Sequence, residues 1–103
     1  MTIKDIQEKI LAGDYRYSDH ALKRMIKRSI EVTEIEEAIS RGEIIEEYPD
    51  DKYSPSCLIL GNTGRGRSLH LQVSFPPRVV IITVYEPDDE EWLNYRVRRR
   101  RSE

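Results

Sequence analysis

The chain has 103 residues, of which 38% are hydrophobic and 35% charged, and a formal net charge of -2. This length supports one hydrophobic core, so we expect a single domain over residues 1–103. No apolar run approaches the roughly 20 residues of a membrane span, and no signal-peptide pattern is present, so we expect a cytoplasmic protein without membrane contact. The single cysteine and two histidines show no zinc-binding spacing, which predicts neither a metal nor another cofactor.

Two segments of the N-terminal part have the spacing of short amphipathic helices. Residues 2–12 precede Gly13, a typical C-terminal cap. Thr33–Glu36 has the pattern of a capping box, and Gly42 is predicted to end that helix in a left-handed conformation. Residues 15–17 are long enough only for an extended connector or an edge strand. The side chains expected to face the core from these helices are Ile3, Ile6, Ile10, Leu11, Ile35, Ala38 and Ile39.

Residues 18–28 are predicted to form a helix with two chemically opposed sides, capped by Ser18 or Asp19. At about 100° per residue, apolar and basic side chains separate. One interpretation is a solvated helix face; the other is an anion site, since an imidazole one turn from a guanidinium suits a phosphate group. The apolar side comprises Ala21, Leu22, Met25 and Ile26, and the basic side comprises His20, Lys23, Arg24, Lys27 and Arg28.

The second half of the chain has the pattern of an antiparallel sheet. Strands are expected at 43–48, 56–62, 68–75 and 78–86. The two glycines of 63–67 indicate a hairpin, so the second and third strands should be antiparallel. The nearly all-apolar fourth strand should lie in the middle of the sheet. The predicted fold is α+β, with the N-terminal helices packed on one side of about four antiparallel strands.

Strict alternation assigns side chains to the two faces of this sheet. Leu69, Leu71, Val73 and Phe75 should face one way, and His70, Gln72 and Ser74 the other. In the last strand, Val80, Ile82 and Val84 should share one face. The other face is expected to carry Val79, Ile81, Thr83 and Tyr85, with Thr83 and Tyr85 on the same side as His70.

The C-terminal segment combines an aromatic anchor with a basic run. Trp92–Leu93 is expected to pack on the domain, whereas Arg96–Arg101 is either a solubilising tail or a contact with RNA or an acidic partner. We therefore divide the domain into an N-terminal helix (1–14), a core (15–98) and a flexible basic tail (99–103).

Five short motifs in this order carry a resemblance. They are His20–Arg28 (His-Ala-x-x-Arg-Met-x-x-Arg), Ala38–Gly42, Tyr53–Gly61, Leu69–His70, and Ile82–Pro87 followed by Trp92. Together they cover residues 17–98 and resemble the bacterial and archaeal family called domain of unknown function 4258 (DUF4258). That family in turn is similar to the small metal-independent ribonucleases that include the RelE-type toxins. The resemblance implies a RelE-like fold, RNA cleavage and a cognate antitoxin protein.

Metal-free RNA cleavage needs a base for the 2′-hydroxyl, cations for the phosphorane and an acid for the leaving group. The expected catalytic residues are His20 as general base or acid, Arg24 and Arg28 as phosphate clamps, and His70, Thr83 and Tyr85 as partners on the sheet. Two alternatives stay open, because His70 can be a strand histidine hydrogen-bonded in place and Tyr85 a ring closing the core edge. The expected nucleic-acid contacts are Lys23, Lys27, Arg96 and Arg98.

Two functions are compatible with these residues. The first is a toxin-type endoribonuclease, neutralised by a partner that covers the basic helix. The second is a binding module that holds RNA or an acidic protein through the same face without cutting it. Two histidines and Tyr85 favour the enzyme, because binding alone requires only the arginines.

Overall fold

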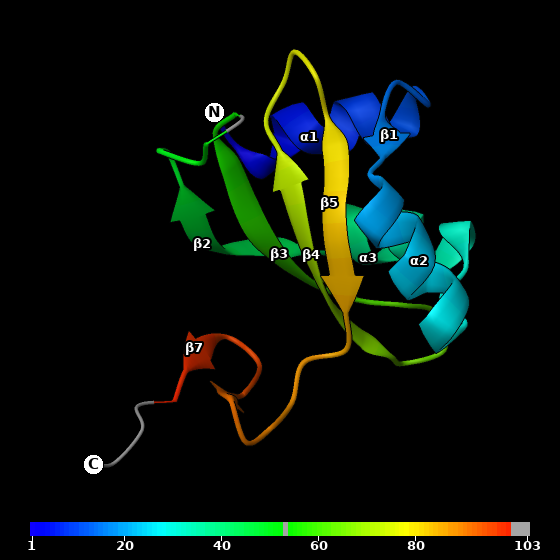
Figure 1. The fold of residues 1–103 in the computed structure, drawn as a ribbon, viewed down its shortest axis with the longest axis vertical. Coiled ribbons are helices and arrows are strands. Elements are labelled where there is room, and N and C mark those ends of the chain that lie inside the picture. Colours follow the sequence, from blue (N-terminus) through cyan, green and yellow to red (C-terminus); the bar gives the residue numbers. More distant parts are fainter. Residues whose placement is uncertain (53, 100–103) are drawn as a thin grey trace.

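The computed structural model describes residues 1–52 and 54–99 and confirms an α+β fold (Figure 1). None of the helices in this part of the chain is long and apolar enough to cross a membrane. The elements in chain order are α1 (Ile3–Leu11), β1 (Arg16–Tyr17), α2 (Asp19–Arg28), α3 (Val32–Ser40), β2 (Glu43–Tyr48), β3 (Ser56–Asn62), β4 (Ser68–Ser74), β5 (Val80–Tyr85), β6 (Trp92–Leu93) and β7 (Val97–Arg98).

The main sheet is mixed and has the strand order β1-β5-β4-β3-β2. Strands β2 to β5 are antiparallel neighbours, as predicted, and the hairpin at 63–67 joins β3 to β4. The edge strand β1 adds a parallel pair with β5, through which Arg16 and Ser18 donate backbone hydrogen bonds to Val79 and Ile81. Strands β6 and β7 form a separate two-stranded sheet.

The helices cover one face of the main sheet, and α1 and α3 lie behind it in Figure 1. Buried Leu69, Leu71 and Val73 of β4 pack there, as the alternation predicts. Cys57 has a packing role in this core, where burial raises the pKa of its thiol to about 12. The principal helix side chains in the core are Ile6, Ile10, Ala21, Met25, Ile35, Ala38 and Ile39.

Three apolar side chains that the helical spacing placed in the core are exposed instead. Leu11 is 91% exposed, Leu22 43% and Ile26 82%. Helix α2 contacts the core mainly along a narrow stripe containing Ala21 and Met25. The reason is that α2 packs at one edge of the main sheet, where β1 and β5 lie. A helix at a sheet edge buries fewer side chains than one lying across the middle.

Both ends of α3 differ from the prediction. Its N-cap is Glu31, whose backbone N–H donates to the Glu34 carboxylate over 3.2 Å, so the capping box lies two residues before the predicted one. Gly42 does not adopt a left-handed conformation. A Cβ at Gly42 would lie 2.6 Å from a methyl carbon of Ile59, so lack of space explains the glycine.

Strand β5 contains a bulge that the strict alternation missed. Ile81 pairs with Val73, but Thr83 pairs with Gln72, which leaves Ile82 as the extra residue. As a result Val79, Ile81 and Val84 all lie in the core, and the predicted separation of Ile81 from Val84 is wrong. Thr83 and Tyr85 do share the second face with His70, as predicted.

Gly61 on β3 is where α3 approaches the sheet most closely. A Cβ at this position would lie 1.8 Å from the backbone oxygen of Ala38, so the helix would have to move. We expect Gly61→Ala to lower the free energy of unfolding by about 1–3 kcal/mol, the usual cost of overpacking. Urea denaturation checks this, with Gly66→Ala on the hairpin as a control for backbone strain, because Gly66 has a φ of +82° but open space around it.

Candidate functional site

The N-terminus of α2 is attached directly to the sheet. The Ser18 hydroxyl oxygen accepts a hydrogen bond from the Ala21 N–H over 3.0 Å and donates one to the Ile82 carbonyl over 2.7 Å. Ser18 is therefore the cap, one of the two residues predicted for that role. Its two bonds fix where the basic side of α2 begins relative to β5.

The basic side of α2 is available for an external ligand. His20, Lys23, Lys27 and Arg28 are exposed and Arg24 is half-buried. Within residues 1–52 and 54–99, no hydrogen bond or ion pair engages these five side chains. Charged side chains without internal partners keep their full capacity to bind phosphate.

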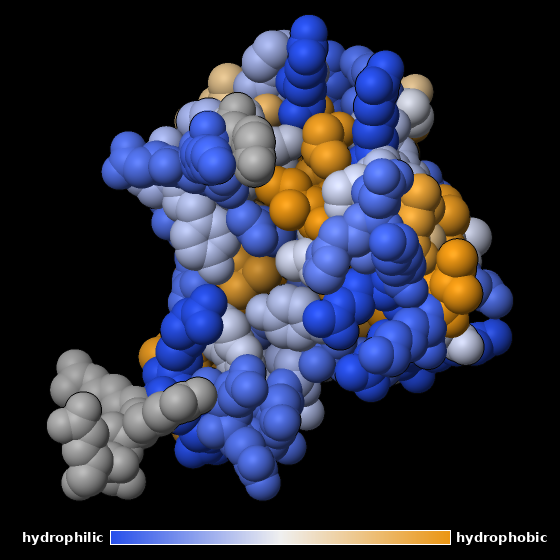
Figure 2. All heavy atoms as spheres, viewed as in Figure 1, coloured by the Kyte–Doolittle hydropathy of each residue, from blue (hydrophilic) through white to orange (hydrophobic). Residues whose placement is uncertain are grey.

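A groove begins beside the N-terminus of α2 and crosses the second face of the sheet. It has a volume of about 640 Å³ and an apolar floor that includes Val80 and Ile82. Gln72 and Arg78 add polar groups to its walls. Figure 2 shows apolar atoms in the hollow at the centre of this face, with hydrophilic side chains around it. The N-terminal cap of α2 thus adjoins a partly apolar recess on the sheet.

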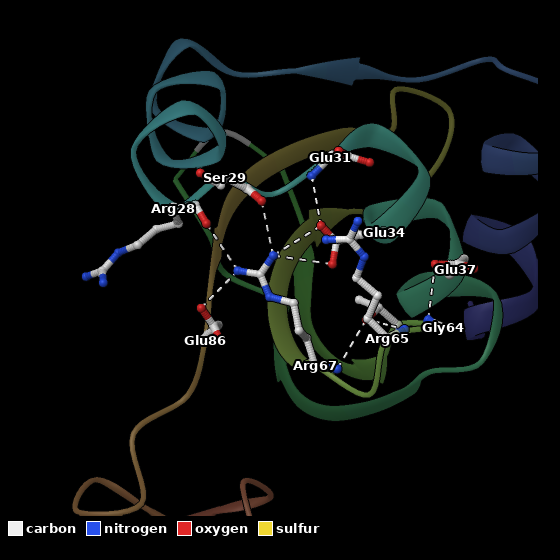
Figure 3. A network of polar contacts seen from close by, with 10 residues as sticks. Arg28, Ser29, Glu31, Glu34, Glu37, Gly64, Arg65, Arg67 and Glu86 are labelled. Carbon is white, nitrogen blue, oxygen red and sulfur yellow. Dashed lines mark hydrogen bonds and ion pairs between the residues drawn. The ribbon is translucent and has the colours of Figure 1, made fainter.

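A partly buried arginine network holds the other end of α2 in place (Figure 3). Arg67 donates to the backbone oxygens of Arg28 and Ser29, each over 3.1 Å. It also pairs with Glu34 at 3.1 Å and Glu86 at 2.9 Å. The Arg28 side chain itself points away from this network. Arg67 thus satisfies carbonyls at the helix C-terminus and connects α2 to the β3–β4 hairpin.

The predicted catalytic residue His70 is fully buried, with 0% of its surface exposed. Its Nε2 lies 2.6 Å from the Tyr95 carbonyl, which can only accept, so Nε2 carries the proton. Nδ1 then accepts a hydrogen bond from the Tyr85 hydroxyl over 3.1 Å. Burial lowers the pKa of His70, although the Tyr95 carbonyl and Glu46 partly oppose that shift. In this conformation His70 is a neutral, fully bonded histidine.

The β6–β7 hairpin encloses His70. Trp92 is only 1% exposed and stacks edge-on against the imidazole, with ring centroids 4.4 Å apart. Arg98 lies over the Trp92 ring at 4.7 Å and pairs with Glu46 at 3.1 Å. Burial acts to raise the pKa of Glu46, but hydrogen bonds from Tyr48 and Arg98 lower it overall. Trp92 is therefore the packing anchor that the sequence predicted.

The described arginines of the C-terminal segment, Arg96, Arg98 and Arg99, all have bonded side chains. Arg96 pairs with Glu43 and Arg98 with Glu46, so both contact β2. Arg99 donates its Nε to the Asp89 carbonyl over 2.6 Å, and its backbone N–H bonds to Glu91. Arg99 is the first residue of the predicted flexible tail, which stays a prediction. Its remaining residues, 100–103, lie outside the described part of the chain, as does Tyr53 of the third motif.

The structure does not bring the predicted catalytic residues into one open site. His20, Arg24 and Arg28 lie on the accessible surface of α2, whereas His70 and Tyr85 bond to each other beneath the hairpin. Among the described residues, none of the hydrogen bonds or ring contacts of His70 involves α2. Thr83 is half-buried on the same face as Tyr85. The accessible candidates are therefore the residues of α2, and the sheet residues form a second, covered cluster.

The family model for a domain of unknown function (DUF4258) matches residues 17–86, from β1 to the end of β5. The chain belongs to the DUF4258 family. No curated protein and no solved structure gives a match. The DUF4258 match includes the basic helix, the arginine network and His70 with Tyr85, but it ends before the β6–β7 hairpin.

Protonation of His70 should destabilise the fold. Because its folded pKa lies below the usual 6.5, the folded state binds fewer protons, so the stabilisation is complete above pH 6.5 and is lost as the pH falls. We expect a loss between pH 6.5 and 5 that His70→Gln does not show, since an amide can make both hydrogen bonds without titrating. Urea denaturation at each pH measures this. The groups facing His70 are Glu46, Tyr85, Trp92, Tyr95 and Arg98. The pKa of Glu46 is lowered from 4.5, so the stabilisation from Glu46 is lost only below pH 4.5 and does not affect this pH range.

Proposed function

We propose that this DUF4258 protein is a cytoplasmic, metal-independent endoribonuclease of the toxin type that binds RNA through α2. The single observation that carries the proposal is the set of unpaired basic side chains on that helix, with His20 one turn from Arg24. An anion site composed of one imidazole and two guanidiniums supplies both phosphate binding and proton transfer. The resemblance to RelE-type ribonucleases supports the same activity.

The residues of α2 divide the chemistry between them. His20 takes the proton of the RNA 2′-hydroxyl or returns one to the 5′-oxygen, because an imidazole can both accept and donate a proton. Arg24 and Arg28 hold the scissile phosphate and stabilise the negative charge that develops on it. Lys23 and Lys27 contact neighbouring phosphates. The groove beside Ser18 offers Val80 and Ile82 as an apolar surface for a base.

A cognate antitoxin is the protein partner that this function requires. An antitoxin that blocks RNA must compete for the same basic side, so we expect an acidic segment. Leu22 and Ile26, which are exposed on the same helix, give such a segment an apolar contact beside Lys23 and Lys27. Arg24→Glu should therefore weaken both RNA binding and antitoxin binding.

The alternative function is a binding module that holds RNA without cutting it. The enclosure of His70 favours this alternative, because a buried histidine with both nitrogens bonded cannot exchange protons with a substrate. Only His20 then remains as an accessible imidazole. A second proton-transfer group would have to come from elsewhere or be uncovered.

The products of RNA cleavage distinguish these functions. Purified protein is incubated with mixed RNA in the presence of a chelator, with and without ribosomes, and the ends are mapped. Attack by the internal 2′-hydroxyl leaves a 2′,3′-cyclic phosphate and needs no added metal. We expect this product from the wild-type protein. RNA that is bound but remains intact under both conditions would support the binding module instead.

A further inference from the structure

The β6–β7 hairpin is held on the domain in an unusual way. It lies beyond the DUF4258 match, and in Figure 1 its ribbon stands apart from the main sheet. In the described chain, none of its backbone ladder bonds join it to that sheet, because β6 and β7 pair only with each other. Its polar and ring contacts with the domain include Trp92 stacked edge-on against His70, the Tyr95 carbonyl on His70, two ion pairs with β2 and a hydrogen bond between Arg98 and Tyr48.

The groups beneath the hairpin are those of an acid–base cluster. A carboxylate, an imidazole and a phenol come together from three strands of the main sheet: Glu46 from β2, His70 from β4 and Tyr85 from β5. The Tyr95 carbonyl bonded to Nε2 and the Trp92 ring both belong to the hairpin, so departure of the hairpin removes two of the groups that enclose His70. The hairpin therefore covers His70, the second histidine, which the accessible site on α2 lacks.

The two ion pairs of the hairpin are the contacts that a polyanion can replace. Arg96 binds Glu43 and Arg98 binds Glu46 with all four side chains partly exposed, between 24% and 63%. Exposed ion pairs contribute little stability and are screened by salt, whereas a polyanion that binds arginines also gains from counterion release. RNA phosphates should thus compete with Glu43 and Glu46. Losing Arg98 also removes the cation from the outer face of Trp92.

We propose that residues 88–99 are an autoinhibitory strap, and that RNA binding to Arg96 and Arg98 lifts Trp92 from His70 and opens the Glu46–His70–Tyr85 cluster to the RNA. The proposal rests on the proposed function, since RNA is its trigger. In the closed form the protein can bind RNA through α2 but lacks an accessible sheet imidazole. In the open form His20 and His70 are both available for proton transfer.

Trp92 reports on the strap directly, because it is the only tryptophan in the chain. The experiment records tryptophan emission and acrylamide quenching of the full-length protein while single-stranded RNA is added, with binding followed separately by fluorescence anisotropy of labelled RNA. Opening should move the emission to longer wavelength and raise the quenching constant severalfold. A base stacked on a closed Trp92 would instead lower the quenching. Inorganic polyphosphate serves as a second probe that cannot be cleaved.

Variants separate the strap from the rest of the site. Arg96→Gln/Arg98→Gln should show the red-shifted, quenchable emission without RNA and should cleave faster than wild type. Arg41→Gln, a change of an exposed arginine at the end of α3 and outside both the groove and the hairpin, should leave the emission of free protein unchanged. Urea denaturation confirms that each variant folds.

Each outcome decides one claim. A shift with RNA or polyphosphate supports the strap, and RNA that is bound but stays intact contradicts the ribonuclease. Bound or cleaved RNA with unchanged emission and quenching overturns the strap and leaves the ribonuclease standing. No binding and no shift overturns both.

Discussion

Replacing His20 by alanine is expected to lower the rate of RNA cleavage by roughly 10²- to 10⁴-fold, the usual contribution of a general acid or base. The reason is that His20 is the only one of the two histidines exposed on the accessible site. The measurement is the single-turnover cleavage rate of a defined RNA by the wild-type and variant proteins, in chelator. RNA affinity should change much less than rate, because Arg24 and Arg28 remain.

The control for this prediction is stability. His20 is exposed and has no hydrogen bond in the described residues, so His20→Ala should leave the free energy of unfolding unchanged within about 0.5 kcal/mol. Equal cutting by variant and wild type would assign the activity to other residues or to a contaminant. A variant that unfolds would show that His20 has a structural role.

Replacing Arg67 by methionine is expected to lower the free energy of unfolding by roughly 3 kcal/mol. This is the usual cost of removing one partner of a buried ion pair and leaving the other charge buried. The variant leaves the Glu34 carboxylate buried with only the Glu31 N–H as its remaining donor, and it frees the carbonyls of Arg28 and Ser29. Urea denaturation gives the value. Because α2 loses its C-terminal anchor, RNA affinity should fall as well.

A double substitution tests whether the uncompensated carboxylate is the cause. Glu34→Gln added to Arg67→Met removes the buried charge, so the double variant should be more stable than Arg67→Met alone. The matched control adds Glu86→Gln to Arg67→Met, which removes the exposed carboxylate partner of Arg67 in place of the buried one. Glu86 is half-exposed, so its loss should cost little. If the double variant is less stable than the single one, loss of the helix-end hydrogen bonds is the main effect.

The features that the sequence predicted are those fixed by local patterns. Alternation along residues 68–75 placed Leu69 and His70 on opposite faces, and the glycines at 63–67 predicted the β3–β4 hairpin. The cap is predicted to be Ser18 or Asp19 because a capping side chain acts within one helical turn, and the structure selects Ser18. These patterns depend only on residues that are close in the sequence, so the predictions made from them also hold in the folded protein.

The features that the sequence did not predict depend on contacts between distant residues. The bulge at Ile82 shifts the pairing register of one half of β5 relative to the other. An uninterrupted run of apolar residues contains no signal for the position of such a bulge. Ile26 is exposed because α2 lies at the sheet edge, which its own spacing cannot show. The sequence predicts a left-handed conformation for Gly42. The structure shows instead that a glycine is needed there because the Ile59 side chain lies too close for a Cβ atom.

The site shows the same division. The basic side of α2 follows from helical spacing, but the enclosure of His70 requires a hairpin more than 20 residues further along the chain. Arg67 was missed because its partners come from α2, α3 and the segment after β5. Glu46 was missed for the same reason, since only the fold brings it to Arg98. A glutamate in an acidic run carries no signal of its own.

Both proposals require RNA to bind to the basic side of α2, and the salt dependence of RNA affinity measures this binding. The comparison is between wild type, Arg24→Ala and Lys4→Ala, which removes an exposed positive charge from α1. We predict that Arg24→Ala weakens binding and lowers the slope of log affinity against log salt by roughly one phosphate contact, while Lys4→Ala changes neither. Equal affinities and slopes for all three proteins would contradict RNA binding to this side of α2.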